Sequence, residues 1–229
     1  MEFDMECFTY ALFVCQYDSK TADLKMPSLT AIERPILKRA VEAINKMNEI
    51  YGRIFDDYFK KLNENGFFCS TYGLTRFVLK RCPDFCQSPS FYNFLLVCLF
   101  LYRLIKSHPE CFLLVETVAK CMLIIYTKQY EEFFEANGSL NGMLKYLDEI
   151  KEEDLRSFIS RNANSENGGI LIPTFEDVLK IVNKFNDDYM LQEWQQDYLY
   201  EFQYPFEEES HKLDNNFETS DYVFYLMKK

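Results

Sequence analysis

The sequence predicts an all-α protein: a single irregular helical bundle, or a stack of helical hairpins of the HEAT or armadillo kind, with an acidic, aromatic-rich C-terminal segment. Apolar residues recur at steps of three and four over residues 36–62, which is the period of a helix that buries one face. Helix start and stop signals bound several further segments. Strand signals are confined to Tyr222–Leu226, and no repeat of fixed length supports a regular solenoid.

The longest predicted helix is Ile36–Leu62, and a shorter helix is expected before it at Met5–Tyr17. The apolar stripe of the long helix consists of Leu37, Val41, Ile44, Met47, Tyr51, Ile54, Tyr58 and Leu62. Residues 30–33 (Thr-Ala-Ile-Glu) have the form of a capping box at its start, although Pro35 can kink the first turn. Asn65-Gly66 supplies the left-handed cap that would end it.

Two more helices are predicted in the middle of the chain, joined by a link of about three residues. Ser88 is the expected N-cap of Ser90–Lys106, with Pro89 in the first helical position. Residues 107–110 (Ser-His-Pro-Glu) form a second capping box that would open Cys111–Ala136, and Asn137-Gly138 would end that helix. Such a short link predicts that the two helices pack as an antiparallel hairpin.

The chain divides into residues 1–161, a helical domain, a linker or loop at 162–173, and residues 174–229, a helix and tail docked on the same domain. Shorter helices are expected at Tyr72–Arg81, Leu140–Lys151 and Glu153–Arg161. The linker follows from the polar, glycine-rich run Arg161–Gly169. Residues 174–177 (Thr-Phe-Glu-Asp) then start the C-terminal helix.

Composition indicates an AT-rich genome and a reducing compartment. Phe, Tyr, Met, Ile, Asn and Lys outnumber Gly, Ala, Arg and Pro about three to one, so the aromatic content by itself says little about function. Eight cysteines accompany an N-terminus without a basic segment, which predicts reduced thiols in a cytoplasmic protein rather than disulfides after secretion. The most apolar run, Phe91–Ile105, is shorter than the roughly 20 residues that span a membrane.

The residues that could carry chemistry do not form a recognisable site. Cys82 and Cys86 are the one close cysteine pair, with Cys69 and His108 at spacings unlike those of structural zinc sites. His108 lies one helical turn before a cysteine, but the helix start around it accounts for its position. No glycine-rich phosphate loop and no calcium loop are present. We therefore expect no catalytic residue, no cofactor and no metal.

Charge is divided unevenly along a chain whose net charge is −11. Residues 31–130 carry a net charge of +5 and residues 131–229 one of −13. The basic middle offers candidate RNA or phosphate contacts at Lys38, Lys46, Arg53, Arg76, Lys80 and Arg81. Acidic residues interleave with them, so binding to free DNA is not expected.

The acidic C-terminal segment alternates carboxylates with large apolar side chains. A row at helical spacing contains Leu191, Trp194, Tyr198 and Phe202, and Tyr204 and Phe206 follow it. Such a pattern either anchors a segment in a partner's groove or covers the domain's own core.

These observations predict a non-enzymatic helical interaction or regulatory protein that docks on a larger protein assembly and has no membrane association. One alternative is a factor bound to a ribosome or other ribonucleoprotein, with the basic middle on RNA and the acidic half on basic proteins. Another is a small helical regulator of host proteins from a virus or parasite, in keeping with the AT-rich composition. A helical enzyme is a weaker alternative, because no catalytic motif is present.

Overall fold

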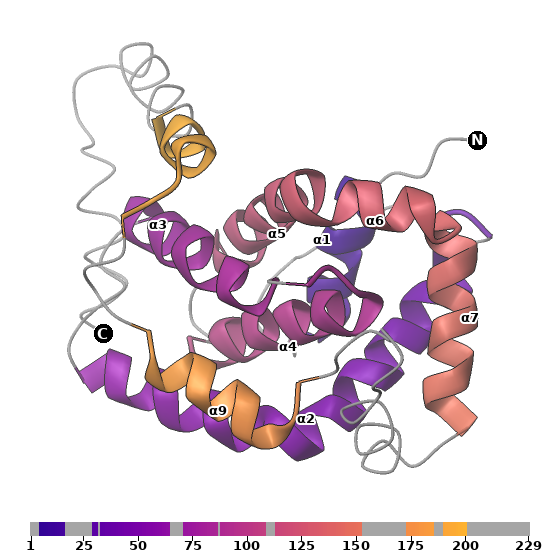
Figure 1. The fold of residues 1–229 in the computed structure, drawn as a ribbon, viewed down its shortest axis with the longest axis horizontal. Helices are drawn as coiled ribbons and strands as arrows, with labels where there is room; N and C mark the ends of the chain where they lie inside the picture. Colours follow the sequence, from indigo (N-terminus) through magenta and orange to yellow (C-terminus); the bar gives the residue numbers. More distant parts are fainter. Residues whose placement is uncertain are drawn as a thin grey trace.

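Helices make up nearly all of the chain that the structure describes (Figure 1). The structure, a computed structural model, describes residues 5–16, 29–31, 33–64, 71–86, 88–108, 113–152, 173–185 and 190–200. Its helices are α1 (Met5–Gln16), α2 (Glu33–Glu64), α3 (Thr71–Arg81), α4 (Phe91–Ser107), α5 (Leu113–Ile125), α6 (Glu131–Ala136), α7 (Ser139–Glu152) and α9 (Phe175–Asn183). A 3₁₀ turn (Cys82–Phe85) follows α3, a π-helical turn (Tyr126–Tyr130) joins α5 to α6, and residues 193–200 form one more helical segment.

The all-α prediction is confirmed for these ranges, which contain no strand and pack as a bundle. The predicted helix Glu153–Arg161, all but the last residue of the predicted linker 162–173, and the strand candidate Tyr222–Leu226 lie outside the described residues. Across the parts of the chain that are described, no helix combines the length and the apolar character that crossing a membrane requires.

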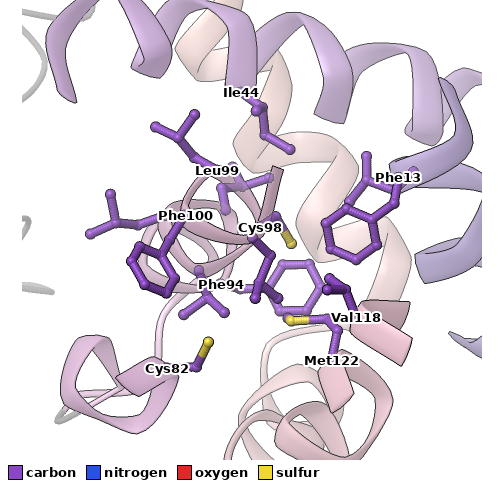
Figure 2. Packing of buried hydrophobic residues seen from close by; sticks show 14 of the residues in the cluster. Phe13, Ile44, Cys82, Phe94, Cys98, Leu99, Phe100, Val118 and Met122 are labelled. Atoms are coloured by element: carbon purple, nitrogen blue, oxygen red, sulfur yellow. The ribbon is translucent and has the colours of Figure 1, made fainter. Parts of the chain in front are cut away.

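α4 lies in the middle of the bundle because it is apolar on nearly every face (Figure 1). All of its residues from Phe91 to Leu101 are buried. Figure 2 shows Ile44 of α2, Phe13 of α1 and Met122 of α5 on different sides of this helix. A helix without a polar face loses water contacts only when other helices surround it, so its sequence determines its central position.

α2 packs along α4 and begins at the predicted capping box. The backbone N–H of Thr30 donates to Glu33 Oε2 at 2.7 Å, and the N–H of Glu33 donates to Thr30 Oγ1 at 3.2 Å. Together these bonds satisfy two N–H groups that have no partner within the helix. The buried face is wider than the predicted stripe, because Phe55 and Phe59 are buried as well.

The start of α4 differs from the prediction. Ser90, not Ser88, is the N-cap, and its hydroxyl accepts from the N–H of Asn93 at 3.1 Å. Ser88 contributes its carbonyl, which accepts from Asn93 Nδ2 at 2.7 Å. The Ser-Pro pair predicts the earlier start, but Pro89 lies outside the helix and the hydrogen bond from the Asn93 N–H makes Ser90 the cap. At the other end, Ser107 is the last residue of α4, and its hydroxyl donates to the carbonyl of Leu104 at 2.7 Å.

The predicted helix Cys111–Ala136 is interrupted by the π-helical turn Tyr126–Tyr130. In an α-helix, residues four apart drift by about 40° around the axis. The wider π turn offsets that drift. Tyr126, Tyr130 and Phe134 therefore all reach the ring of Phe94, with centroids 6.3, 5.5 and 5.1 Å away. Packing against α4 thus explains the interruption.

A tight turn at Gly138 separates α6 from α7, as the Asn-Gly pair predicts. Gly138 has φ +84°, a conformation that favours glycine. Gly142 allows the first turn of α7 to pass close to the preceding chain, because a Cβ atom there would clash with the carbonyl oxygen of Asn137.

α9 packs against α2 and the 3₁₀ turn. It begins with a capping box in which the N–H of Thr174 donates to Asp177 Oδ2 at 3.1 Å, so this predicted helix start is confirmed. The hydrogen bond from the Thr174 hydroxyl holds the pKa of the Asp177 carboxyl below its usual value. Just before the cap, the carbonyl of Pro173 accepts from the hydroxyl of Tyr51 at 2.8 Å. Phe185, just after the helix, lies under the guanidinium of Arg81, 4.8 Å from the ring centroid.

Candidate partner-binding groove

A surface hollow of about 490 Å³ lies beside α1 and the first turns of α2. We call it the α1–α2 groove. It is lined by Cys15, Leu29, Arg34, Leu37, Lys38, Val41 and Glu42. Of these residues, only Lys38 is among the predicted contact residues.

One wall of the groove is a charged row on α2. Arg34, Lys38 and Glu42 are spaced by four residues, so they follow one another along one side of the helix at intervals of about 6 Å. All three are exposed. Leu37 and Val41 form a parallel apolar row beside them.

The floor of the groove is apolar. Leu29 and Leu37 are only 6% and 5% exposed, and Val41 is half-buried. Cys15 contributes a thiol from the end of α1, and partial burial raises the pKa of this thiol above its ordinary value. The thiol is therefore protonated at neutral pH and adds a neutral surface rather than a reactive thiolate.

The geometry of the charged row is fixed by the start of α2. The Nε–H of Arg34 donates to the carbonyl of Leu29 at 3.1 Å, which ties the floor to the first turn of the helix. A guanidinium has five N–H donors, and this bond uses one of them. The end of the groove near Arg34 and Lys38 is thus suited to an anionic group, and the end near Glu42 to a cationic one.

Of the other predicted RNA contacts, Lys46 follows Lys38 and Glu42 along the same side of α2, but it is not among the described residues that line the groove. Arg53 and Arg76 are exposed and Lys46 is half-buried, but Lys80 and Arg81 are only 7% and 3% exposed. Little of the surface of the last two is therefore in contact with solvent. Lys38 and Arg53 are separated by about 22 Å along α2. Exposed acidic residues occupy the interval and the next turn of the same helix: Glu42, Glu49, Asp56 and Asp57.

The described part of the C-terminal segment packs on the bundle through residues that the sequence did not single out. Gln195 is fully buried, and its Nε2 donates to the carbonyl of Leu79 at 2.6 Å. That carbonyl belongs to the last turn of α3, where helix carbonyls lack partners of their own. Leu199, one turn further on, is 4% exposed.

The predicted tail anchors lie beside this inward row. Leu191, Trp194 and Tyr198 are half-buried and in contact with the core. The indole N–H of Trp194 donates to Gln192 Oε1 at 2.6 Å. The other predicted anchors, Phe202, Tyr204 and Phe206, lie outside the described residues. No pattern in the sequence indicates Gln195, because its hydrogen bond requires the last turn of α3 to lie beside it in the folded protein.

A second hollow, of about 310 Å³, lies beside α1 and α5. It is lined by Glu6, Cys7, Tyr10, Glu116, Ala119 and Lys120. The ammonium of Lys120 is already paired with the carboxylate of Glu116 at 2.8 Å. The charges that line the second hollow are therefore partly compensated within the protein, whereas the charges of the α1–α2 groove follow one another along one side of α2.

The buried cysteines are neutral core side chains. Burial raises the pKa of Cys86 and Cys121 to about 12, and it raises those of Cys82 and Cys98 as well. The hydroxyl of Tyr130 donates to Cys86 Sγ at 3.0 Å. Among the described residues, no three His, Cys, Asp or Glu side chains are arranged to hold a metal ion.

The imidazole that sequence spacing brought near a cysteine is part of a helix end. His108 Nδ1 lies 2.8 Å from the Ser107 hydroxyl and 3.3 Å from the carbonyl of Leu104. Cys111 lies outside the described residues.

The protein is an all-α bundle with an apolar surface hollow that has one charged wall. Comparisons with protein-family models, with curated proteins and with solved structures find no match to the chain.

Proposed function

We propose that this chain is a non-enzymatic helical interaction protein whose α1–α2 groove binds a short, acidic, amphipathic segment of a partner protein. The observation that carries the proposal is the pairing of an apolar floor with a cationic rim: Leu29, Leu37 and Val41 beside Arg34 and Lys38. An amphipathic segment places apolar side chains on such a floor and carboxylates against such a rim.

A protein segment fits this surface better than RNA does. RNA-binding surfaces track phosphates with a continuous basic stripe, and they stack bases on aromatic side chains. Among the described residues that line the groove none is aromatic, and its row of charges turns negative at Glu42. Docking on a ribonucleoprotein through RNA is therefore the less supported alternative.

Selection from a displayed library of random peptides of about 12 residues tests the proposal without a known partner. We expect the selected peptides to be enriched in acidic and large apolar residues. The variant Arg34→Glu/Lys38→Glu should bind the selected peptides at least about tenfold more weakly than the wild type does, because two attractions become repulsions. Arg53→Glu, an exposed arginine on the same helix but outside the groove, is the matched control and should keep them.

Two results would overturn the proposal. One is the recovery of the same acidic peptides by the double variant. The other is an absence of enrichment while a single-stranded RNA oligonucleotide binds the wild type and loses affinity with rising salt. Circular dichroism and thermal unfolding of each variant establish that the bundle is intact before binding is compared.

A further inference from the structure

The order of the charges along α2 specifies more than an acidic ligand. Read from the N-terminal end of the helix, the row is Arg34, Lys38, Glu42: positive, positive, negative. A ligand helix lying along this row meets two cations and then an anion at intervals of one turn. Resting on the proposed function, we infer that the α1–α2 groove receives its partner as a helix antiparallel to α2, with a basic residue one turn before two acidic residues.

The register follows from the spacing of the rows. Because Arg34, Lys38 and Glu42 are four residues apart, a neighbouring helix opposes them with residues that are also three or four apart. Its two acidic residues face Arg34 and Lys38, and its basic residue faces Glu42. Its apolar residues, on the adjacent row, rest on Leu37 and Val41. The groove volume of about 490 Å³ suits a few large side chains, so the recognised segment is short.

The direction follows from the ends of the two helices. A parallel ligand would place its own N–H groups, the positive end of its dipole, beside Arg34 and Lys38. An antiparallel ligand instead brings its last, unpaired carbonyls to the two cations, where they accept hydrogen bonds. The acidic residues contact the two cations in either direction, and the unpaired carbonyls add their hydrogen bonds only in the antiparallel one.

Two synthetic peptides of about four helical turns, identical in composition and apolar pattern, distinguish the directions. In the first, the basic residue precedes the two acidic residues in the chain, and in the second it follows them. Fluorescence polarisation should show tighter binding of the first peptide, by up to about fivefold. The same peptide should slow alkylation of Cys15, read at that residue by mass spectrometry, since its thiol lines the groove.

A charge exchange tests the register. Lys38→Glu should weaken binding of the first peptide, and replacing the peptide's middle charge, an acidic residue, with lysine should restore it. Glu42→Lys should weaken binding of the unchanged first peptide. Replacing the basic residue of that peptide with an acidic one should restore its binding to Glu42→Lys. Arg53→Glu remains the unaffected control.

The outcomes separate the inference from the proposed function. Equal binding of both peptides, each abolished by Arg34→Glu/Lys38→Glu, would overturn the antiparallel arrangement and leave the groove as an acidic-peptide site. Tighter binding of the second peptide would likewise overturn it. No binding of either peptide, after a library selection that also recovers none, would overturn the proposed function and this inference with it.

Discussion

Replacement of Tyr51 by phenylalanine should destabilise the bundle through the loss of a buried hydrogen-bond chain. The Tyr51 hydroxyl lies 2.8 Å from the Tyr92 hydroxyl and 2.8 Å from the carbonyl oxygen of Pro173. A carbonyl only accepts, so Tyr51 donates to Pro173 and Tyr92 donates to Tyr51. Tyr51→Phe therefore removes both bonds and leaves a hydroxyl and a carbonyl without these partners.

The expected loss in the free energy of unfolding is about 2–3 kcal/mol for Tyr51→Phe. Each hydrogen bond contributes about 1 kcal/mol net, and a buried group left unpaired adds to the loss. Tyr92→Phe removes one bond and leaves only an acceptor site on Tyr51, so about 1 kcal/mol is expected. Tyr72→Phe, at a tyrosine that is 39% exposed, is the matched control and should change stability by less than about 0.5 kcal/mol.

Equilibrium unfolding in urea, followed by circular dichroism, measures these differences in the free energy of unfolding. We expect the slope of that free energy against urea concentration to stay the same in each variant. Because the Pro173 carbonyl directly precedes α9, amide hydrogen exchange within 174–185 should also quicken in Tyr51→Phe more than in Tyr92→Phe. Equal losses for the two variants, or unchanged exchange in α9, would refute the assignment of Tyr51 as the link between α2 and α9.

Three further predictions concern the helix ends and the core. Gly142→Ala should lower stability by about 2 kcal/mol or more in thermal unfolding, since its Cβ would clash with the Asn137 carbonyl oxygen; an unchanged midpoint would contradict that close approach. Ser90→Ala should cost about 1 kcal/mol, whereas Ser88→Ala should cost much less, because only its carbonyl is used; the reverse order in urea unfolding would restore Ser88 as the cap. Burial raises the pKa of Cys86 to about 12, so the unfolded chain releases this proton at lower pH. The contribution of the neutral thiol is present below about pH 9 and is lost as pH rises towards 12. Unfolding free energies in this range should fall less steeply in Cys86→Ala, and an identical slope would speak against a buried thiol.

Helix starts and periodicity could be predicted from the sequence because they depend on neighbours within a few residues. The capping boxes at Thr30 and Thr174 place a hydroxyl and a carboxylate three residues apart, and both are present in the structure. The prediction of Ser88 as a cap is wrong by two residues, because both Ser88 and Ser90 are possible caps in the sequence and the hydrogen bond from the Asn93 N–H selects Ser90.

Features that depend on packing between helices could not be predicted in the same way. The π-helical turn exists because three aromatic side chains converge on Phe94. Lys80 and Arg81 look like surface charges in the sequence, yet their helix turns them inward. The α1–α2 groove was missed apart from Lys38, since its floor forms only where α1 meets α2. The two neighbouring rows Arg34/Lys38 and Leu37/Val41 are the sequence pattern that could have indicated the groove.

The pairing of α1 with α5 has a consequence for how the chain folds. The two helices contact each other although about 100 residues of sequence separate them. At synthesis rates of roughly 5–20 residues per second, α1 waits about 5–20 s for its main partner. During that time Phe8, Leu12 and Phe13, all fully or almost fully buried at the end, have no α5 to cover them. Contacts between residues so far apart in the sequence slow folding, so we expect this bundle to fold more slowly than one built from sequential helical hairpins.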